Sequence, residues 1–394
     1  MLPLYEPQED SYLLAKHVKK HAKGIVLDIG TGTGIQALSS LENKKVRKVI
    51  GVDISKSAIE YCKKNIKNKK AEFIISDLFT YFHRKSPNKF DTIIFNPPYL
   101  PSELKLRDLT TEGGKNGYET IVRFLSDANN FLNPNGNILL VFSSLTNKEK
   151  IAEIISNNLL EYIALDTRHM FFEEIYVYLI RKSSLLKNLE HRGIRNIKYF
   201  TKGKHGIIYQ GILNRKMVAI KLENPNSKAL NKISKEARLL RTLNNHRIGP
   251  KLLLSSEKFF VSEFIHGKFI YDYIRNNEDK QIKLLIKKIF TQLFLLDKLC
   301  ISKEEMHRPI KHIILRGHSP VLIDFERAHY TEKPKNITQF CEFIMRSKRL
   351  LMEKGITINQ ANLIDFAKKY RHKQTKNLKE AYILFQQGFL KKHT

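Results

Sequence analysis

The sequence is poor in cysteine and contains no long apolar run. Its three cysteines, Cys62, Cys300 and Cys341, lie far apart, and none belongs to a CxxC pair. This usage is typical of a reducing compartment and speaks against a disulfide framework or a cysteine-based zinc site. No apolar run approaches the length of a membrane span, and the first ten residues do not resemble a secretory signal. We therefore expect a soluble, cytoplasmic protein.

The chain of 394 residues is too long for one ordinary core and suits two domains. Residues 1–183 carry 26 Lys and Arg against 21 Asp and Glu, a net charge of +5, whereas residues 184–394 carry 43 against 18, a net charge of +25. A basic half favours a polyanionic partner such as RNA, the ribosome or nucleotide phosphates. A coding bias toward lysine is the other explanation of this positive charge. The charges are dispersed rather than gathered in one basic block, so both explanations stay open at this point.

Apolar runs alternate with amphipathic stretches throughout the first half. Strands are expected at residues 24–29, 49–52, 72–75, 90–95, 136–142, 162–165 and 174–180, and helices at 11–20, 35–41 and 56–65. This alternation without a long gap predicts an α/β fold with a doubly wound, mainly parallel sheet. In such a sheet the ligand binds at the carboxyl ends of the strands.

A glycine-rich turn follows the first expected strand. Gly30, Gly32 and Gly34 stand at alternate positions, where the missing side chains permit a tight turn and the close approach of a cofactor. Asp53 ends the second strand, in a position to accept hydrogen bonds from ribose hydroxyls. Asp77 follows the third strand. The turn and the two acids at successive strand ends predict a cofactor that contains a nucleoside.

The segment Phe95-Asn96-Pro97-Pro98-Tyr99 follows the fourth expected strand. Two consecutive prolines remove two backbone donors, so the chain leaves the sheet as a stiff hook. The amide oxygen of Asn96 and the backbone carbonyl of Pro97 make an acceptor pair for the two hydrogens of a planar NH2 group. Tyr99 offers a flat face for stacking. We expect these three residues to be catalytic and Asn96 also to contact the cofactor.

The cofactor is either a dinucleotide or S-adenosylmethionine. Asp28 stands directly before the glycines, where its carboxylate can bind the ammonium of a methionine moiety and would repel a pyrophosphate. The hook at the fourth strand end provides a place for a methyl acceptor. Both features favour S-adenosylmethionine.

These motifs resemble those of the class I methyltransferases, and within them the HemK-like group. The matching pieces are YEPQED, DIGTGTG, VDIS, SDLF, FNPPYLP and EGGKNG, the last covering Glu112 to Gly117. The resemblance implies a Rossmann-like sheet and methylation of a glutamine side chain in a peptide-chain release factor. The chain looks like the short archaeal and eukaryotic form, which in that family works with a small zinc-ribbon activator. The exocyclic amine of adenine in nucleic acid is the rival acceptor, because the hook suits both planar NH2 groups.

The second half contains a different set of motifs. Gly203 and Gly206 belong to a glycine-spaced hairpin that can cover phosphates with backbone N–H groups. Lys221 on the next strand can pair with those phosphates, and Glu236 on the following helix can pair with Lys221. Asp324 ends a later strand and is a natural ligand for Mg²⁺.

This order of loop, lysine, glutamate and aspartate resembles that of protein kinases. Residues 184–394 look like an archaeal group of predicted serine/threonine kinases related to the RIO-type atypical kinases, which implies a small α+β kinase-like domain that binds ATP and Mg²⁺. We place the domain boundary near Ser183. Kinases have a catalytic Asp and, five residues on, an Asn where this chain has His307 and His312. Because histidine is a poor Mg²⁺ ligand, we expect nucleotide binding with weak phosphotransfer, with His307, or Glu304 or Glu305, as the base.

Two functions of different classes are therefore in view. The first is an enzyme that methylates a glutamine amide and carries an ATP-binding domain. The second is an adaptor bound to RNA or the ribosome, whose kinase-like half reads nucleotide state without catalysis. His307 and His312 favour the adaptor, whereas the intact motifs of the first half favour the enzyme.

Overall fold

The computed structural model describes residues 6–84, 89–99, 115–203, 206–224, 231–373 and 377–389. Contacts between residues divide the chain into two compact units, Met1–Tyr199 with Gly211–Arg215, and Phe200–Gln210 with Lys216–Thr394. Within the described ranges, no helix combines the length and the apolar character needed to cross a bilayer.

The first unit is built on one seven-stranded sheet in the order β3-β2-β1-β4-β5-β7-β6. Neighbours are parallel from β3 to β5, and β7 is antiparallel to both β5 and β6. The prediction of a mainly parallel, doubly wound sheet is confirmed. Its strands are β1 (Gly24–Ile29), β2 (Val46–Asp53), β3 (Ala71–Ile75), β4 (Phe90–Phe95), β5 (Leu132–Ser143), β6 (Leu160–His169) and β7 (Glu174–Lys182).

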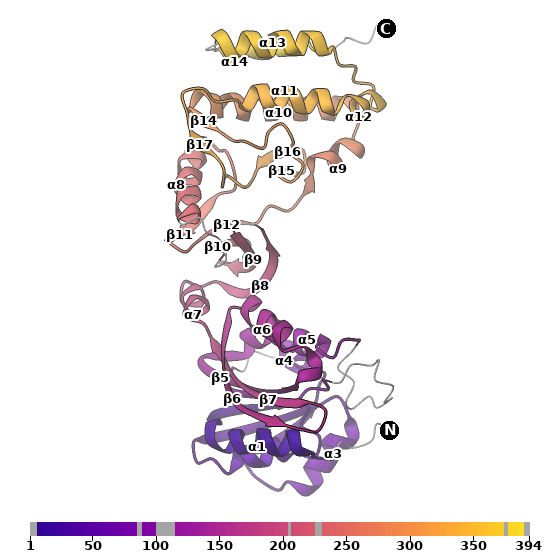
Figure 1. Cartoon of the computed structure of the whole chain (residues 1–394), viewed down its shortest axis with the longest axis vertical. Helices are drawn as coiled ribbons and strands as arrows, with labels where there is room; N and C mark the ends of the chain where they lie inside the picture. Colours follow the sequence, from indigo (N-terminus) through magenta and orange to yellow (C-terminus); the bar gives the residue numbers. More distant parts are fainter. Residues whose placement is uncertain are drawn as a thin grey trace. The chain divides into compact units, whose positions relative to one another are not determined.

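Helices cover both faces of this sheet (Figure 1). On one face, α1 (Glu9–His21), α2 (Ile35–Leu41) and α3 (Lys56–Asn65) contribute apolar side chains to a core shared with the strands. The other face carries α4 (Thr80–His83), α5 (Glu119–Phe131) and α6 (Lys148–Asn157). There the rings of Phe79 and Phe131 stack at 4.6 Å, and Phe95 and Phe124 lie equally close. The two layers hold the carboxyl ends of the parallel strands at one edge.

The first unit extends beyond the boundary that we expect near Ser183. Helix α7 (Ser184–His191) begins with Ser183 as its N-cap, whose hydroxyl accepts a hydrogen bond from the Leu186 N–H. The fully buried Nζ of Lys182, at the end of β7, binds the Glu190 carboxylate on α7 at 2.5 Å. This buried ion pair ties α7 to the sheet, and for that reason the helix belongs with the first unit.

The second unit combines antiparallel sheets with helices. A five-stranded sheet has the order β11-β12-β10-β9-β8, and a smaller one the order β13-β15-β16. The division between the units passes through β8 (Arg195–Lys202) and β9 (Gly206–Leu213). The strands that lie wholly in the second unit are β10 (Lys216–Glu223), β11 (Leu252–Ser255), β12 (Phe259–Glu263), β13 (Lys268–Phe269), β14 (Ile301–Ser302), β15 (Ile313–Arg316), β16 (Ser319–Leu322) and β17 (His329–Tyr330).

The helices of the second unit share one apolar core, to which α10, α11, α13 and α14 contribute (Figure 1). They are α8 (Lys232–Asn245), α9 (Ile270–Arg275), α10 (Asp279–Lys298), α11 (Asn336–Arg346), α12 (Lys348–Glu353), α13 (Gln360–Lys373) and α14 (Leu378–Gln386). This composition agrees with an α+β domain, and its kinase-like identity stays a prediction.

Gly34 provides a test of the packing beneath the first turn. Its φ is +84°, and an added Cβ would lie 2.4 Å from Cδ1 of Ile66 on the segment after α3. Gly32 also has a positive φ, +53°, but its nearest neighbour would be 3.9 Å away. We expect Gly34→Ala to lower the free energy of unfolding by about 2–4 kcal/mol, from backbone strain plus overpacking, and Gly32→Ala by about 1 kcal/mol, from strain alone. Urea denaturation followed by circular dichroism measures both, and equal losses would contradict the overlap.

Candidate functional site

A cavity of about 440 Å³ opens at the carboxyl ends of β1, β2 and β4. The sequence-predicted residues that line it come from four successive strand ends and the loops that follow them. They are Gly30, Gly32, Asp53, Asp77, Asn96, Pro97 and Tyr99. The structure therefore brings together most of the residues predicted for cofactor and acceptor binding, as expected when parallel strands end at one edge.

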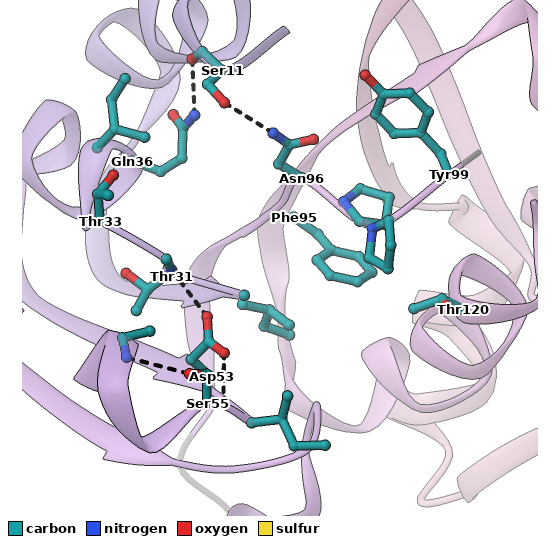
Figure 2. Close-up of a pocket in the computed structure, with 18 of the residues that line it drawn as sticks. Ser11, Thr31, Thr33, Gln36, Asp53, Ser55, Phe95, Asn96, Tyr99 and Thr120 are labelled. Carbon is teal, nitrogen blue, oxygen red and sulfur yellow. Dashed lines mark hydrogen bonds between the residues drawn. The ribbon is translucent and has the colours of Figure 1, made fainter. Parts of the chain in front are cut away.

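The glycine turn is fixed by Asp53 (Figure 2). The Gly32 N–H donates to Oδ2 of Asp53 at 3.0 Å, and the Ser55 N–H donates to Oδ1 at 2.8 Å. Gly30 and Gly32 have φ values of +65° and +53°, which side chains rarely adopt. Each carboxylate oxygen accepts more than one hydrogen bond, so Asp53 can hold the turn and still receive ribose hydroxyls from the cavity.

Asp28 lies in a different place from the one expected. Its side chain is buried, does not line the cavity, and uses Oδ2 to accept hydrogen bonds from the Thr31 hydroxyl at 2.6 Å and the Ala37 N–H at 3.1 Å. We expected this carboxylate to bind the methionine ammonium. In the structure Asp28 instead joins the glycine turn to α2. Gly34, which we also expected at the cofactor, packs beneath the turn and does not line the cavity.

Gln36 is a residue of the cavity that sequence reasoning missed. It is 3 % exposed, and its Nε2 donates to the backbone oxygen of Ser11 at 2.9 Å. Its Oε1 is buried and has no hydrogen-bond partner among the described residues. A buried acceptor without a partner is costly unless a ligand supplies a donor. Gln36 therefore offers what Asp28 does not, an acceptor for the ammonium of a methionine moiety, and no motif in the sequence indicated it.

Asp77 is held at the rim of the cavity by a cation. Its Oδ2 lies 2.7 Å from Nη2 of Arg123 on α5, and both residues line the cavity. Leu78, the next residue, has a positive φ of +48° and also lines the cavity. Arg123 was not among the predicted residues, since its distance from Asp77 along the sequence gives no sign of the contact.

The hook presents one unsatisfied acceptor. Nδ2 of Asn96 donates to Oδ2 of Asp10 at 3.0 Å and to the Ser11 hydroxyl at 3.2 Å. Oδ1 of Asn96 is buried and has no hydrogen-bond partner in the described part of the chain. Figure 2 shows the amide nitrogen turned toward Ser11 and the oxygen on the side of Tyr99. Because Pro97 and Tyr99 line the same cavity, this arrangement can receive a planar NH2 group.

Two predicted segments fall outside the described residues. Of the EGGKNG piece, Glu112 to Gly114 lie outside, and Tyr5 of the first motif does as well. In the second unit, the residues between Gly203 and Gly206 are also outside the described ranges.

The second unit brings Lys221, Glu236 and Asp324 together. Nζ of Lys221 lies 2.7 Å from Oε2 of Glu236 and 2.8 Å from Oδ1 of Asp324, with Oε2 of Glu326 at 3.6 Å. Burial opposes the charge on Lys221, but the carboxylates outweigh it and raise its pKa. Burial likewise opposes the charge on Asp324, and the attraction of Lys221 outweighs it and lowers the pKa of Asp324 to about 2. Lys221 and Asp324 are therefore charged at neutral pH, whereas burial raises the pKa of Glu236.

The glycine hairpin passes beside the lysine. The Gly203 N–H donates to the Gly206 carbonyl oxygen at 2.8 Å. A Cβ on Gly206 would lie 3.0 Å from Cε of Lys221, so the backbone there packs directly on the lysine stem. The four residues predicted to bind ATP thus form a chain of contacts, from Gly203 to Gly206, from Gly206 to Lys221 and from Lys221 to Glu236.

His307 does not share these contacts. Its Nδ1 faces the Glu304 carbonyl oxygen at 3.1 Å, whereas Nδ1 of His312 is 3.9 Å from Oδ2 of Asp324. Fully buried Lys303 donates to the Asp324 carbonyl oxygen and lies 3.5 Å from Oε2 of Glu305. The described contacts therefore connect Glu305, rather than His307, to Asp324 through Lys303.

Asp28 makes the stability of the first unit dependent on pH. Burial raises its pKa to about 7, despite the two hydrogen bonds that favour the carboxylate. The folded protein therefore holds a proton that the unfolded chain releases near pH 4, so stability falls as pH rises from 4 to 7, by at most about 1.4 kcal/mol per unit. Asp28→Asn removes this contribution. Urea denaturation at pH 5, 6 and 7 measures the difference, and parallel curves for the two proteins would contradict it.

Residues 6–169 match the family model of the methyltransferase small domain. A Methanocaldococcus jannaschii protein, named as a candidate protein N5-glutamine methyltransferase, is 37 % identical over 154 residues, which cover 37 % of this chain and 76 % of that one. The Bacillus cereus release factor glutamine methyltransferase is 34 % identical over 34 % of this chain and 52 % of its own length. The Bacteroides fragilis tRNA1(Val) (adenine(37)-N6)-methyltransferase is 31 % identical over 34 % of this chain and 57 % of its own.

Among solved structures, the Mtq2-Trm112 complex of E. cuniculi, described as responsible for methylation of the eRF1 termination factor, has 27 % identity and a TM-score of 0.37 over 45 % of this chain and 98 % of that one. The chain spans only about half the length of the B. cereus and B. fragilis relatives. The extensive match to the M. jannaschii protein, together with the family model, is what assigns the first unit. The chain belongs to the HemK-like, S-adenosylmethionine-dependent methyltransferases that carry the methyltransferase small domain.

Proposed function

We propose that the first unit methylates the side-chain amide of a glutamine in a peptide-chain release factor. The observation that carries this proposal is the buried Oδ1 of Asn96, which has no partner among the described residues and belongs to a wall of the cavity. A glutamine amide provides the missing donor. Its second hydrogen can bind the backbone carbonyl of Pro97, and Tyr99 lines the same cavity.

The residues of the cavity fit S-adenosylmethionine. Asp53 is placed for the ribose hydroxyls, Asp77 for the adenine end, and Oε1 of Gln36 for the ammonium. When bound, the cofactor supplies a sulfonium methyl group, and the acceptor nitrogen forms its bond to that carbon as the bond to sulfur breaks. Asn96 and Pro97 hold the two N–H groups so that the nitrogen lone pair is directed at the methyl carbon. The contribution of the protein is positioning and electrostatic stabilisation, which together supply several kcal/mol.

Adenine in nucleic acid is the second candidate acceptor. Its exocyclic amine presents the same planar NH2 group, and one relative is a tRNA adenine-N6 methyltransferase. The net charge of +25 on residues 184–394 favours contact with RNA or the ribosome and is compatible with this alternative. The higher identity to relatives named as glutamine methyltransferases supports the protein substrate as our first candidate.

The resemblance of the motifs of the first unit to those of the archaeal and eukaryotic enzymes leads us to expect a small zinc-ribbon partner. The release factor is the other expected partner. Both are proposals about the assembled enzyme.

Replacement of Asn96 by Ala tests the acceptor site. We expect the rate of methyl transfer to purified release factor to fall at least a hundredfold, whereas the Kd for S-adenosylmethionine changes by less than about threefold, because Asn96 acts chiefly in the transition state. The same assay with transfer RNA and DNA in place of release factor distinguishes the two acceptors. Normal transfer by the variant would make the hook a structural element, and transfer to nucleic acid alone would give preference to adenine.

We further propose that the second unit binds ATP with Mg²⁺ through Gly203, Gly206, Lys221, Glu236 and Asp324. The ion pairs of Lys221 with Glu236 and Asp324 support this. Oxygens of Glu236, Asp324 and Glu326 lie within 4.8 Å of one another, a spacing that suits a divalent cation. If phosphotransfer is weak or absent, the unit acts as a nucleotide-dependent adaptor, the other function considered from the sequence.

Asp324→Ala tests this second site. We expect Mg²⁺-dependent ATP binding to weaken at least tenfold, since the variant loses a metal ligand and a partner of Lys221, while methyl transfer continues at the wild-type rate. Equilibrium dialysis of labelled ATP against the full chain measures the affinity. Asp272→Ala, which removes an exposed acid on α9 of the same unit, is the matched control. Failure of the unaltered protein to bind ATP at millimolar concentration would remove the site.

A further inference from the structure

We propose that Asp10 is a positioning residue that sets the orientation of the Asn96 amide and increases the negative charge on its oxygen. This inference rests on the proposed methylation of an NH2 group. Asp10 lies in the first turn of α1, is 6 % exposed and lines the cavity. The sequence places it at the end of the YEPQED motif.

The carboxylate of Asp10 joins the two side chains of the hook. Its Oδ2 accepts hydrogen bonds from Nδ2 of Asn96 at 3.0 Å and from the Tyr99 hydroxyl at 3.2 Å. Its Oδ1 accepts the Ser11 N–H at 2.6 Å. The Ser11 contact fixes the carboxylate against the backbone of α1, so that one rigid acceptor determines where the amide and the ring lie.

An amide can present either its oxygen or its nitrogen to a cavity, and its neighbours decide which. An ionised carboxylate only accepts hydrogen bonds, so Asp10 requires Nδ2 of Asn96 to face it. The Ser11 hydroxyl donates to Oδ1 of Asp10 at 3.3 Å, so it too presents a lone pair to Nδ2 of Asn96. Asp10 therefore leaves Oδ1 on the cavity side, where it lacks a partner among the described residues. In the reverse orientation, Oδ1 of Asn96 would face Oδ2 of Asp10, and two oxygens that only accept would lie together. The N–H groups of Asn96 would then point at the substrate NH2 group, which is itself a donor.

The negative charge of Asp10 also affects the chemistry. A hydrogen bond from Nδ2 to an anion shifts electron density along the amide toward Oδ1. The acceptor nitrogen becomes positive as the methyl group arrives, and its N–H groups then bind Oδ1 more strongly. This strengthening occurs in the transition state and not in the bound substrate, so it raises kcat more than it lowers KM.

Asp10→Asn in the full chain tests the inference. We expect kcat for release factor to fall about a hundredfold, with KM and the Kd for S-adenosylmethionine within about threefold of wild type. Glu9→Gln is the matched control, because it neutralises the adjacent acid, which is half exposed and paired with Arg168. The control is expected to keep the wild-type kcat, and an equal loss in both variants would assign the effect to the helix N-terminus in general.

A double-mutant cycle with Asn96→Ala separates positioning from a merely structural role. If Asp10 acts through Asn96, Asp10→Asn causes no further loss of kcat in the Asn96→Ala background. Losses that multiply in the double variant would overturn the inference and leave the proposed function intact. An Asn96→Ala single variant with normal activity would instead remove the proposed function itself.

Asp10→Glu provides a second measurement should Asp10→Asn fail to fold. It retains the charge at a displaced position, and we expect a kcat between those of the Asn variant and the wild type, with unchanged affinity for S-adenosylmethionine. Thermal denaturation of each variant reports on folding. A glutamate variant with the wild-type kcat, or one no more active than a folded asparagine variant, contradicts the role of the precisely placed charge.

Discussion

The first unit depends on a turn of glycines at positive φ, and two carboxylates hold this turn in place. Asp53 binds the turn from the cavity side through the Gly32 N–H, and Asp28 binds it from below through the Thr31 hydroxyl and the Ala37 N–H. Backbone at positive φ has no side chain of its own to stabilise it, so the constraint must come from neighbouring elements. The cost is a buried acid whose pKa is raised to about 7.

The sequence was sufficient for the elements and for most of the cavity lining. The helices over residues 35–41 and 56–65 and the strand over 90–95 have the expected bounds, because their apolar periodicity and flanking turn residues are unambiguous. Asp53 and Asn96 lie at the cavity because parallel strands end at one edge. Which atoms are left without partners could not be predicted. Ser11 on α1 accepts hydrogen bonds from the amide nitrogens of both Gln36 and Asn96, which leaves their amide oxygens without a partner among the described residues. Residue spacing does not reveal these contacts.

The second unit shows the same division between local pattern and long-range contact. Lys221, Glu236 and Asp324 were identified as a set by their order, and they are in contact. The order of motifs does not identify a catalytic base in the second unit. The kinase pattern has an Asp at that position, whereas this sequence has His307. Buried Lys303, which connects Glu305 to the backbone of Asp324, is not part of this order of motifs. The hydrogen bond from Lys303 to the Asp324 carbonyl oxygen cannot be predicted from the spacing of residues along the sequence.

An amide nitrogen is a weak nucleophile because its lone pair is shared with the carbonyl group. In the proposed reaction, acceptors on both N–H groups favour the form in which the lone pair is available. After the bond between nitrogen and the methyl carbon has formed, one proton of the nitrogen passes to solvent water, so that no dedicated base is required. A hundredfold change in rate corresponds to about 2.7 kcal/mol. One hydrogen bond to a charged group contributes about 1.5–3 kcal/mol. A hydrogen bond to the anion of Asp10, acting through the Asn96 oxygen that has no partner among the described residues, is therefore strong enough to account for an effect of this order. Positioning of the two reactants then supplies the larger part of the rate.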